Sequence, residues 1–306
     1  MYSPSLPEVQ VHTWFWQDLP IRYQRSGSGG SNLVLIHGFG ASSDHWRYNL
    51  PVIAQYHQVF AIDLLGFGFS AKPAPGPQRT SDQVPYTFAT WGEQLVAFCR
   101  EVVGGPAFLV GNSIGCVVAL QTAVLDPELV QGLALLNCSL RQFHERKQPG
   151  LAWHERIAVP WIQGLLGNRI LSRLFFSAIA RPGTLKAILK QAYVNPDAVT
   201  DDLVNLLLAP AREPGAAEVF TAFLCYSQGP LAEDLLPQVQ VPVLIVWGEA
   251  DPWEPIALGR ELANFPVVEE FVTLPGVGHC PQDEAPQQVN PLLLRWLERH
   301  GAKAIP

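Results

Sequence analysis

Three residues of this chain have the types and the order that acyl transfer by a serine requires. Ser113, Asp251 and His279 occur in that sequence. A reacting serine needs a base that removes its proton and an acid that orients the base. Serine, then acid, then histidine is one of the chain orders in which such triads occur. We therefore predict that Ser113 is a nucleophile, His279 its base and Asp251 the orienting acid.

The serine lies in residues 111–115, which read Gly-Asn-Ser-Ile-Gly between two apolar runs. A buried strand, a tight turn that carries a serine and then a helix form a nucleophile elbow. We expect Ser113 near positive φ, and glycine at 111 and 115 because larger side chains would clash there. The alternative is a glycine-rich turn with an idle serine, since the short pattern also occurs by chance.

Asp251 comes five residues after the apolar run 243–246. Glu249 and Glu254 are nearby competitors, but the short side chain of Asp251 suits a fixed hydrogen bond to an imidazole. Another position for the acid would follow the preceding apolar run, and residues 136–138 read Leu-Asn-Cys there, without a carboxylate. Asp251 is therefore the acid that we predict.

His279 is flanked by glycines in residues 276–280, Gly-Val-Gly-His-Cys. This composition suits a loop that lays a side chain across a sheet edge, and the alternative is a surface histidine. Residues 37–40, His-Gly-Phe-Gly, follow another apolar run, and a loop there can present a backbone N–H to an oxyanion. We assign the two oxyanion donors to the backbone N–H groups of Phe39 and Ile114.

The elements that must position these residues alternate between short β-rich runs and helical stretches. This alternation predicts an α/β fold with a mostly parallel, eight-stranded sheet and helices on both faces. We expect the first two strands to form an antiparallel hairpin at one edge. The expected strands are 13–16, 21–24, 33–36, 59–62, 107–110, 133–136, 243–246 and 270–274.

Residues 139–235 show no convincing strand pattern and interrupt this alternation. We predict a helical lid there, inserted into a core formed by residues 1–138 and 236–306, because open α/β sheets bind ligands at the carboxyl edge of their strands. Phe143 and Trp153 of the lid and Trp253 of the core are the substrate contacts that we expect.

The two halves of the predicted lid carry opposite net charges. Residues 139–190 contain nine Lys or Arg and two Glu, whereas residues 191–235 contain one Arg and seven Asp or Glu. Around residues 169–178 the basic half is amphipathic, which suits peripheral contact with an anionic membrane. The alternative is a lid helix whose apolar face covers the pocket and whose charges are solvated.

Composition excludes other classes of protein. A net charge of −7 argues against a nucleic-acid partner. The five cysteines form no Cys-x-x-Cys pair, and we expect reduced thiols, no metal site and no cofactor. Residues 63–70 lack the dinucleotide and P-loop patterns, so Asp63 is expected to be a structural hydrogen-bonding residue. The 24 uncharged residues 102–125 contain a proline and four glycines, which favours strand, elbow and helix over a membrane span.

Together these motifs resemble the α/β-hydrolase superfamily over residues 12–300. Within it the chain is similar to the pheophytinase and chlorophyll dephytylase group. The similarity is carried by residues 111–115, by residues 135–137, Leu-Leu-Asn, by Asp251-Pro-Trp and by residues 278–286, Gly-His-Cys-Pro-Gln-Asp-Glu-Ala-Pro. Members of the group often read Leu-Gly-Gly after the serine, whereas this chain has Ile114, Gly115 and Cys116. The resemblance implies a lipophilic ester substrate, the phytyl ester of chlorophyll or of its magnesium-free form.

Residues 1–10 lack the basic and apolar regions of a signal or transit peptide. We therefore expect a cytoplasmic protein, or one peripherally associated with a photosynthetic membrane. Three other functions stay open: a general carboxylesterase, a C–C bond hydrolase with the same triad, and a ligand receptor that does not catalyse. Haloalkane dehalogenases and epoxide hydrolases of this superfamily use an aspartate nucleophile, and position 113 is a serine.

Overall fold

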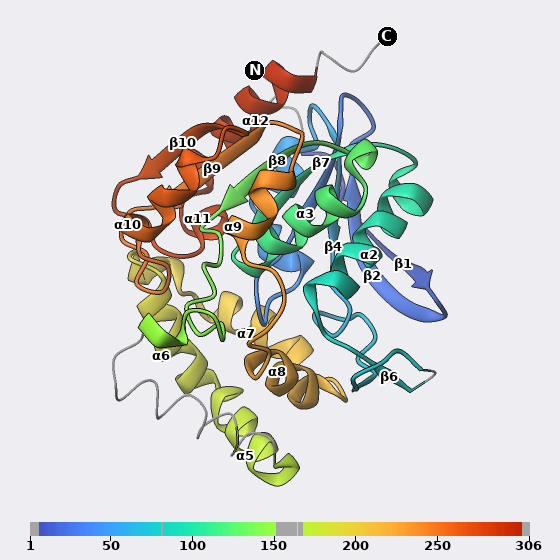
Figure 1. The fold of residues 1–306 in the computed structure, drawn as a ribbon, viewed down its shortest axis with the longest axis vertical. Helices are drawn as coiled ribbons and strands as arrows, with labels where there is room; N and C mark the ends of the chain where they lie inside the picture. The colour runs from blue at the N-terminus through green and yellow to red at the C-terminus, as the bar shows by residue number, and fades with distance from the viewer. Residues whose placement is uncertain (1–5, 81, 151–163, 165–167, 302–306) are drawn as a thin grey trace.

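A sheet of eight strands forms the centre of the computed structural model, which describes residues 6–80, 82–150, 164 and 168–301 (Figure 1). The strand order is β1-β2-β4-β3-β7-β8-β9-β10. β2 runs antiparallel to β1 and β4, and every other neighbouring pair is parallel. The predicted sheet and its edge hairpin are confirmed. The bounds are β1 Gln10–Trp16, β2 Leu19–Ser26, β3 Asn32–Ile36, β4 Gln58–Ile62, β7 Ala107–Asn112, β8 Val130–Leu136, β9 Val243–Gly248 and β10 Val268–Leu274.

Both faces of the sheet are covered by helices, as predicted. In β3, Val34 and Ile36 pack into the core on the side of α2 (Phe88–Phe98) and α3 (Ile114–Leu125). Leu33 and Leu35 pack on the other side, with α1 (Leu50–Ile53) and α12 (Pro286–Gly301). A strand that is buried on both faces reads as a continuous apolar run.

The parallel strands end at one edge of the sheet, and the predicted site residues follow these ends. β7 ends at Asn112, directly before Ser113, and β9 ends at Gly248, shortly before Asp251. The loop that carries His279 follows β10. Ligands of open α/β sheets bind at this edge.

The connection from β8 to β9 contains α5 (Arg169–Ile179), α6 (Pro182–Ala192), α7 (Asp201–Ala211), α8 (Ala216–Leu224) and α9 (Ala232–Leu235). Figure 1 shows α5 to α8, in yellow to brown, gathered outside the layers of the sheet. The described part of this connection has no strand. The remaining strands and α-helices are short: β5 (Ala74–Pro75), β6 (Gln83–Val84), α10 (Ile256–Gly259) and α11 (Pro281–Glu284).

Ion pairs join the two oppositely charged halves of this connection. The pairs are Arg146–Asp234 and Arg173–Glu218 at 2.6 Å, Lys147–Glu233 at 2.8 Å and Lys186–Asp201 at 2.5 Å. Such exposed pairs contribute little to the free energy of folding. They do show that the basic and the acidic segments of this connection lie against each other. Among the described residues, no helix has the length and the apolar character needed to cross a membrane.

Candidate active site

Ser113 occupies a strained turn between β7 and α3. Its φ is 55° and its ψ is −118°, so the predicted positive φ is confirmed. A Cβ at Gly111 would lie 2.4 Å from the carbonyl carbon of Gly115, and one at Gly115 would lie 2.4 Å from the oxygen of Ile36. Glycine is therefore required at both positions, as the elbow pattern predicts. Strain of this kind persists where the surrounding structure enforces it, often at active sites.

The structure brings Asp251 and His279 together. The Nδ1 atom of His279 lies 2.7 Å from Oδ2 of Asp251, which also accepts a 2.7 Å hydrogen bond from the Asn137 side chain. The other oxygen, Oδ1, accepts the backbone N–H groups of Trp253 (2.8 Å) and Glu254 (3.0 Å). Burial raises the pKa of Asp251, but the bonds from His279, Asn137 and Glu254 outweigh it and the pKa is lowered. An ionised Asp251 accepts a hydrogen bond from Nδ1–H of His279. The Nε2 atom of His279 is then free to act as a base.

The backbone of His279 is fixed at both of its polar groups. Its N–H donates to the carbonyl of Ala192, at the end of α6, at 2.8 Å. Its carbonyl accepts a 3.1 Å hydrogen bond from the side chain of Asn112, the residue before the predicted nucleophile. The loop of residues 276–280, which we call the histidine loop, is thus hydrogen-bonded both to the elbow and to the helices between β8 and β9.

Glu284 reinforces this connection. Its Oε2 accepts the N–H of Gly278 and its Oε1 accepts the N–H of Asn195, both at 2.7 Å. The residue is buried, so the carboxylate satisfies two backbone donors that would be costly to leave without partners. One side chain therefore holds the loop before His279 against the segment that follows α6.

The loop of residues 37–40 is oriented by a buried histidine. Nε2 of His37 accepts the N–H of Leu64 at 3.1 Å, so Nδ1 carries the hydrogen and donates to the carbonyl of Gly38 at 2.7 Å. Burial lowers the pKa of His37, which favours this neutral form. The Gly38–Phe39 peptide is trans, so the Phe39 N–H points opposite to the fixed carbonyl. The Phe39 N–H thus remains available as a donor, and Ile114 begins α3, where a helix leaves its N–H groups unpaired. The role of both N–H groups as oxyanion donors stays a prediction.

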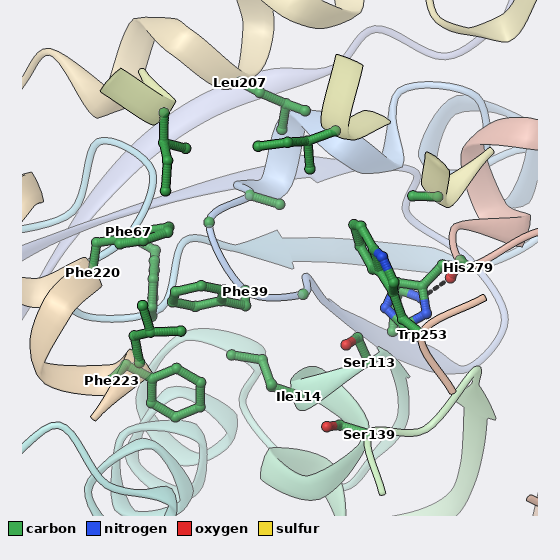
Figure 2. Close-up of a pocket in the computed structure, with 18 of the residues that line it drawn as sticks. Phe39, Phe67, Ser113, Ile114, Ser139, Leu207, Phe220, Phe223, Trp253 and His279 are labelled. Atoms are coloured by element: carbon green, nitrogen blue, oxygen red, sulfur yellow. Dashed lines mark hydrogen bonds between the residues drawn. The ribbon is translucent and has the colours of Figure 1, made fainter. Parts of the chain in front are cut away.

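A cavity of about 760 Å³ joins these groups (Figure 2). Ser113, His279, Phe39 and Ile114 all line it, and Ser113 is 9% exposed. Figure 2 shows an aromatic end opposite His279, where Phe39 lies 4.6 Å from Phe220 between ring centroids. Most of the remaining lining is apolar, as is usual for small-molecule sites. The aromatic end consists of Phe39, Phe67, Phe220 and Phe223.

The predicted substrate contacts have different outcomes. Trp253 lines the cavity with its ring centroid 5.0 Å from that of His279, and it is 40% exposed. Phe143 also lines the cavity and is 57% exposed. Trp153 lies outside the described residues. The structure thus places two of the three side chains at the cavity, and their contact with a substrate stays a prediction.

Asp63 has the structural role that the sequence suggested. Its carboxylate accepts the N–H of Ser43 at 2.7 Å and that of Phe69 at 2.8 Å, and it pairs with Arg22 at 3.3 Å. The five cysteines form no disulfide, and four of them are buried. Within the described ranges no cluster of three or more metal-ligating side chains is found.

Sequence reasoning assigned no role in the site to Asn112, Asn137 and Glu284, although all three lie in segments that carry the family resemblance. Each has a local signal: Asn112 lies inside the elbow, Asn137 directly follows β8 and Glu284 lies in the segment that carries His279. A polar residue at the end of a buried strand is a candidate for the edge where ligands bind. The partners of these residues lie in distant segments, and the sequence alone does not show them.

The fold and this site define a class of protein. The sequence matches the family described as "Alpha/beta hydrolase family" over residues 33–292, and the chain belongs to that family. It is therefore a hydrolase with the α/β-hydrolase fold. A solved relative, the serine hydrolase CarC involved in carbazole degradation, superposes with a TM-score of 0.74 at 22% identity, covering 95% of this chain and all of that one.

Two curated relatives are relevant to the activity that this chain has within the family. The chain is 29% identical to the chloroplastic pheophytinase of Arabidopsis thaliana over 94% of its length, and it covers 66% of that protein. It is 31% identical over 97% of its length to the dihydrolipoyllysine-residue acetyltransferase component of the acetoin cleaving system of Pseudomonas putida, of which it covers 70%. The chain thus spans about two thirds of the length of these relatives.

Proposed function

We propose that this hydrolase cleaves carboxylic esters with Ser113, His279 and Asp251 as its triad. The observation that carries the proposal is the 2.7 Å contact between His279 and Asp251 at the cavity that Ser113 lines from a strained elbow. An orienting carboxylate, a base and a raised serine are the parts that acyl transfer needs.

The mechanism follows from these positions. His279 takes the proton of Ser113 through Nε2 as the hydroxyl attacks the ester carbonyl, and Asp251 stabilises the imidazolium that forms. The N–H groups of Phe39 and Ile114 stabilise the oxyanion. His279 then protonates the leaving alcohol. Water activated by the same imidazole attacks the acyl-enzyme and releases the acid.

We propose a lipophilic ester as the substrate, and specifically the phytyl ester of chlorophyll or of its magnesium-free form. The similarity to pheophytinase and the apolar cavity with its aromatic end support this choice. In this proposal residues 139–235 act as a lid over the cavity. The alternatives are a general carboxylesterase, a C–C bond hydrolase, an acyltransferase like the second relative, and a receptor that binds without turnover.

A substrate panel tests the proposal. Ser113→Ala should lower turnover of pheophytin a, chlorophyll a and p-nitrophenyl esters by about 10³-fold or more while the circular dichroism spectrum stays unchanged. Ser28→Ala, at an exposed serine between β2 and β3, is the matched control and should retain full activity. Undiminished hydrolysis by Ser113→Ala excludes the serine mechanism. Turnover of short esters without pigment hydrolysis supports the carboxylesterase, and pigment binding without turnover supports the receptor.

The expected contact of residues 139–190 with an anionic membrane stays a proposal. Ile170 and Leu174 of α5 are exposed, which supports it. Four of the basic residues are already engaged in ion pairs: Arg146, Lys147, Arg173 and Lys186. Co-sedimentation with anionic and neutral vesicles tests this contact. Equal retention on both kinds of vesicle would argue against an electrostatic attachment.

A further inference from the structure

The wall of the cavity differs in chemical character between its two ends. The aromatic end consists of phenylalanine rings, and the ring of Phe39 lies 5.8 Å from that of Phe67 and 5.2 Å from that of Phe223 between centroids. On the side of His279, α6 and α7 line the cavity with aliphatic side chains. We call this part the aliphatic wall, and its residues are Leu185, Ile188, Leu189, Ala192, Leu207 and Leu208.

The aliphatic wall lies against the histidine loop. The N–H of His279 donates to the carbonyl of Ala192 at 2.8 Å, and the next residue, Cys280, belongs to the same apolar cluster as Ala192 and side chains of α7. Ile188 lies one helical turn before Ala192, so both side chains share a face of α6, and both line the cavity. Trp253 also borders this side, with its ring beside that of His279. A group that is bound next to His279 therefore lies next to the aliphatic wall.

The chemistry of acyl transfer limits how an ester can lie between these walls. In the proposed mechanism the reacting carbon carries four groups: the oxygen of Ser113, the oxyanion, the leaving oxygen of the alcohol and the acyl chain. His279 must reach the leaving oxygen to protonate it, so the alcohol part begins beside His279. The oxyanion points to the N–H groups of Phe39 and Ile114. The acyl chain is the remaining substituent, and the tetrahedral carbon directs it away from the leaving oxygen and from His279.

The aromatic end lies in the direction of the acyl chain. Figure 2 shows His279 and Phe220 on opposite sides of Ser113. Contact between aromatic rings is more favourable than the burial of their area alone, whereas an alkyl chain gains from burial against any apolar wall. The aromatic end therefore suits an acyl part that carries a planar ring, and the aliphatic wall suits an alkyl alcohol.

We propose that this hydrolase selects esters that join an acyl part with an aromatic or other conjugated ring to an aliphatic alcohol. The ring lies at the aromatic end and the alcohol lies along the aliphatic wall, so Phe220 and Ile188 determine specificity for different parts of one ester. This inference rests on the proposed ester hydrolysis, because the preference is measured through turnover at Ser113. The phytyl esters of the proposed function have this arrangement, since the pigment ring belongs to their acyl part and phytol is their alcohol.

Two isomeric esters test the orientation. Octyl hydrocinnamate has its phenyl ring in the acyl part, and its isomer hydrocinnamyl octanoate has the ring in the alcohol. We expect kcat/KM for octyl hydrocinnamate to be about threefold to tenfold higher, the effect of one favourable ring contact. Phe220→Leu should lower this preference by about twofold or more, whereas Phe220→Tyr, which keeps a ring, should retain it. Phe175→Leu, the same change at an exposed phenylalanine of α5 outside the cavity lining, is the matched control.

The length of the alcohol tests the aliphatic wall. Ile188→Ala should lower kcat/KM for octyl hydrocinnamate by about threefold to tenfold, because the octyl chain loses apolar contact. Ethyl hydrocinnamate should be nearly unaffected, since its alcohol is too short to lie along α6. Phe220→Leu should instead lower kcat/KM for both esters, because they share their acyl part. An equal fall for the octyl and ethyl esters in Ile188→Ala would contradict the aliphatic wall as the alcohol site.

The outcomes separate this inference from the proposed function. A wild-type enzyme that hydrolyses both isomers at the same kcat/KM, that prefers hydrocinnamyl octanoate or that accepts neither would overturn the inference. In each of these cases the proposed function stands as long as the wild type hydrolyses p-nitrophenyl esters and Ser113→Ala does not. Hydrolysis of p-nitrophenyl esters by Ser113→Ala would instead overturn the proposed function.

Discussion

The two ends of the cavity are held together by different forces. At the His279 end, four hydrogen bonds reach the carboxylate of Asp251, and both polar backbone groups of His279 are engaged. At the aromatic end, the Phe39 ring contacts Phe220 at 4.6 Å and Phe223 at 5.2 Å between centroids. Hydrogen bonds fix distance and direction, whereas apolar contact is largely non-directional.

The origins of the two ends differ as well. The groups proposed to react come from loops that directly follow strands of the sheet, so the register of the sheet sets their spacing. Phe220 and Phe223 come from α8, which belongs to the connection between β8 and β9. A substitution in α8 can therefore alter the apolar lining of the cavity without changing the strands that position the reacting groups, which is how one fold serves many activities.

The largest expected effect is at the His279 end of the cavity, which we call the polar end. Asp251→Asn keeps the size of the side chain but offers an N–H to Nδ1 of His279, which then loses its hydrogen and the productive tautomer. We expect kcat for any accepted ester to fall by about 10³- to 10⁴-fold. Steady-state kinetics on a short p-nitrophenyl ester, with circular dichroism as the folding control, measures this. A fall of less than tenfold would show that the polar end is not catalytic.

A smaller effect is expected at the aromatic end. Phe220→Ala removes the ring that packs on Phe39, and the lost apolar contact should raise KM for long-chain esters by about tenfold with kcat nearly unchanged. Short esters that do not reach this end should show little change. Phe175→Ala, at an exposed phenylalanine of α5 outside the cavity lining, is the matched control. Equal effects on long and short esters would contradict the division between the two ends.

The sequence predicts the strands and the residues of the polar end well. The five central strands β3, β4, β7, β8 and β9 were predictable because strands buried on both faces are continuous apolar runs. Ser113 was predictable because its strained turn requires Gly111 and Gly115. Asp251 and His279 follow predicted strands, so the topology of a parallel sheet already places them at one edge. Their contact, now seen at 2.7 Å, was the expectation with the most physical support.

The contacts between distant segments were not predictable. Glu284 holds Gly278 and Asn195, and Asp283 accepts a 3.0 Å hydrogen bond from the hydroxyl of Tyr193. In the sequence these two carboxylates belong to a segment that suggested a subfamily and a substrate. The structure shows in addition that they position the loop of His279, because they join it to the end of α6 and to the segment that follows. No local pattern specifies such partners, since they depend on how the connection folds back.

Glu254 lies at the polar end, and its substitution gives the smallest effect that we expect, a change in how stability depends on pH. Its pKa is raised above the ordinary value of 4.5 by burial, so the folded state holds its proton more tightly than the unfolded state. Its contribution to stability is complete below pH 4.5 and is lost as the pH rises through the folded-state pKa. In the variant Glu254→Gln the side chain has no proton to lose, so this loss of stability does not occur.

The free energy of unfolding of Glu254→Gln, relative to the wild type, should therefore increase as the pH rises above 4.5 and level off above the folded-state pKa. Urea denaturation at a series of pH values measures this increase. A difference that is independent of pH would contradict a raised pKa of Glu254 in the folded protein.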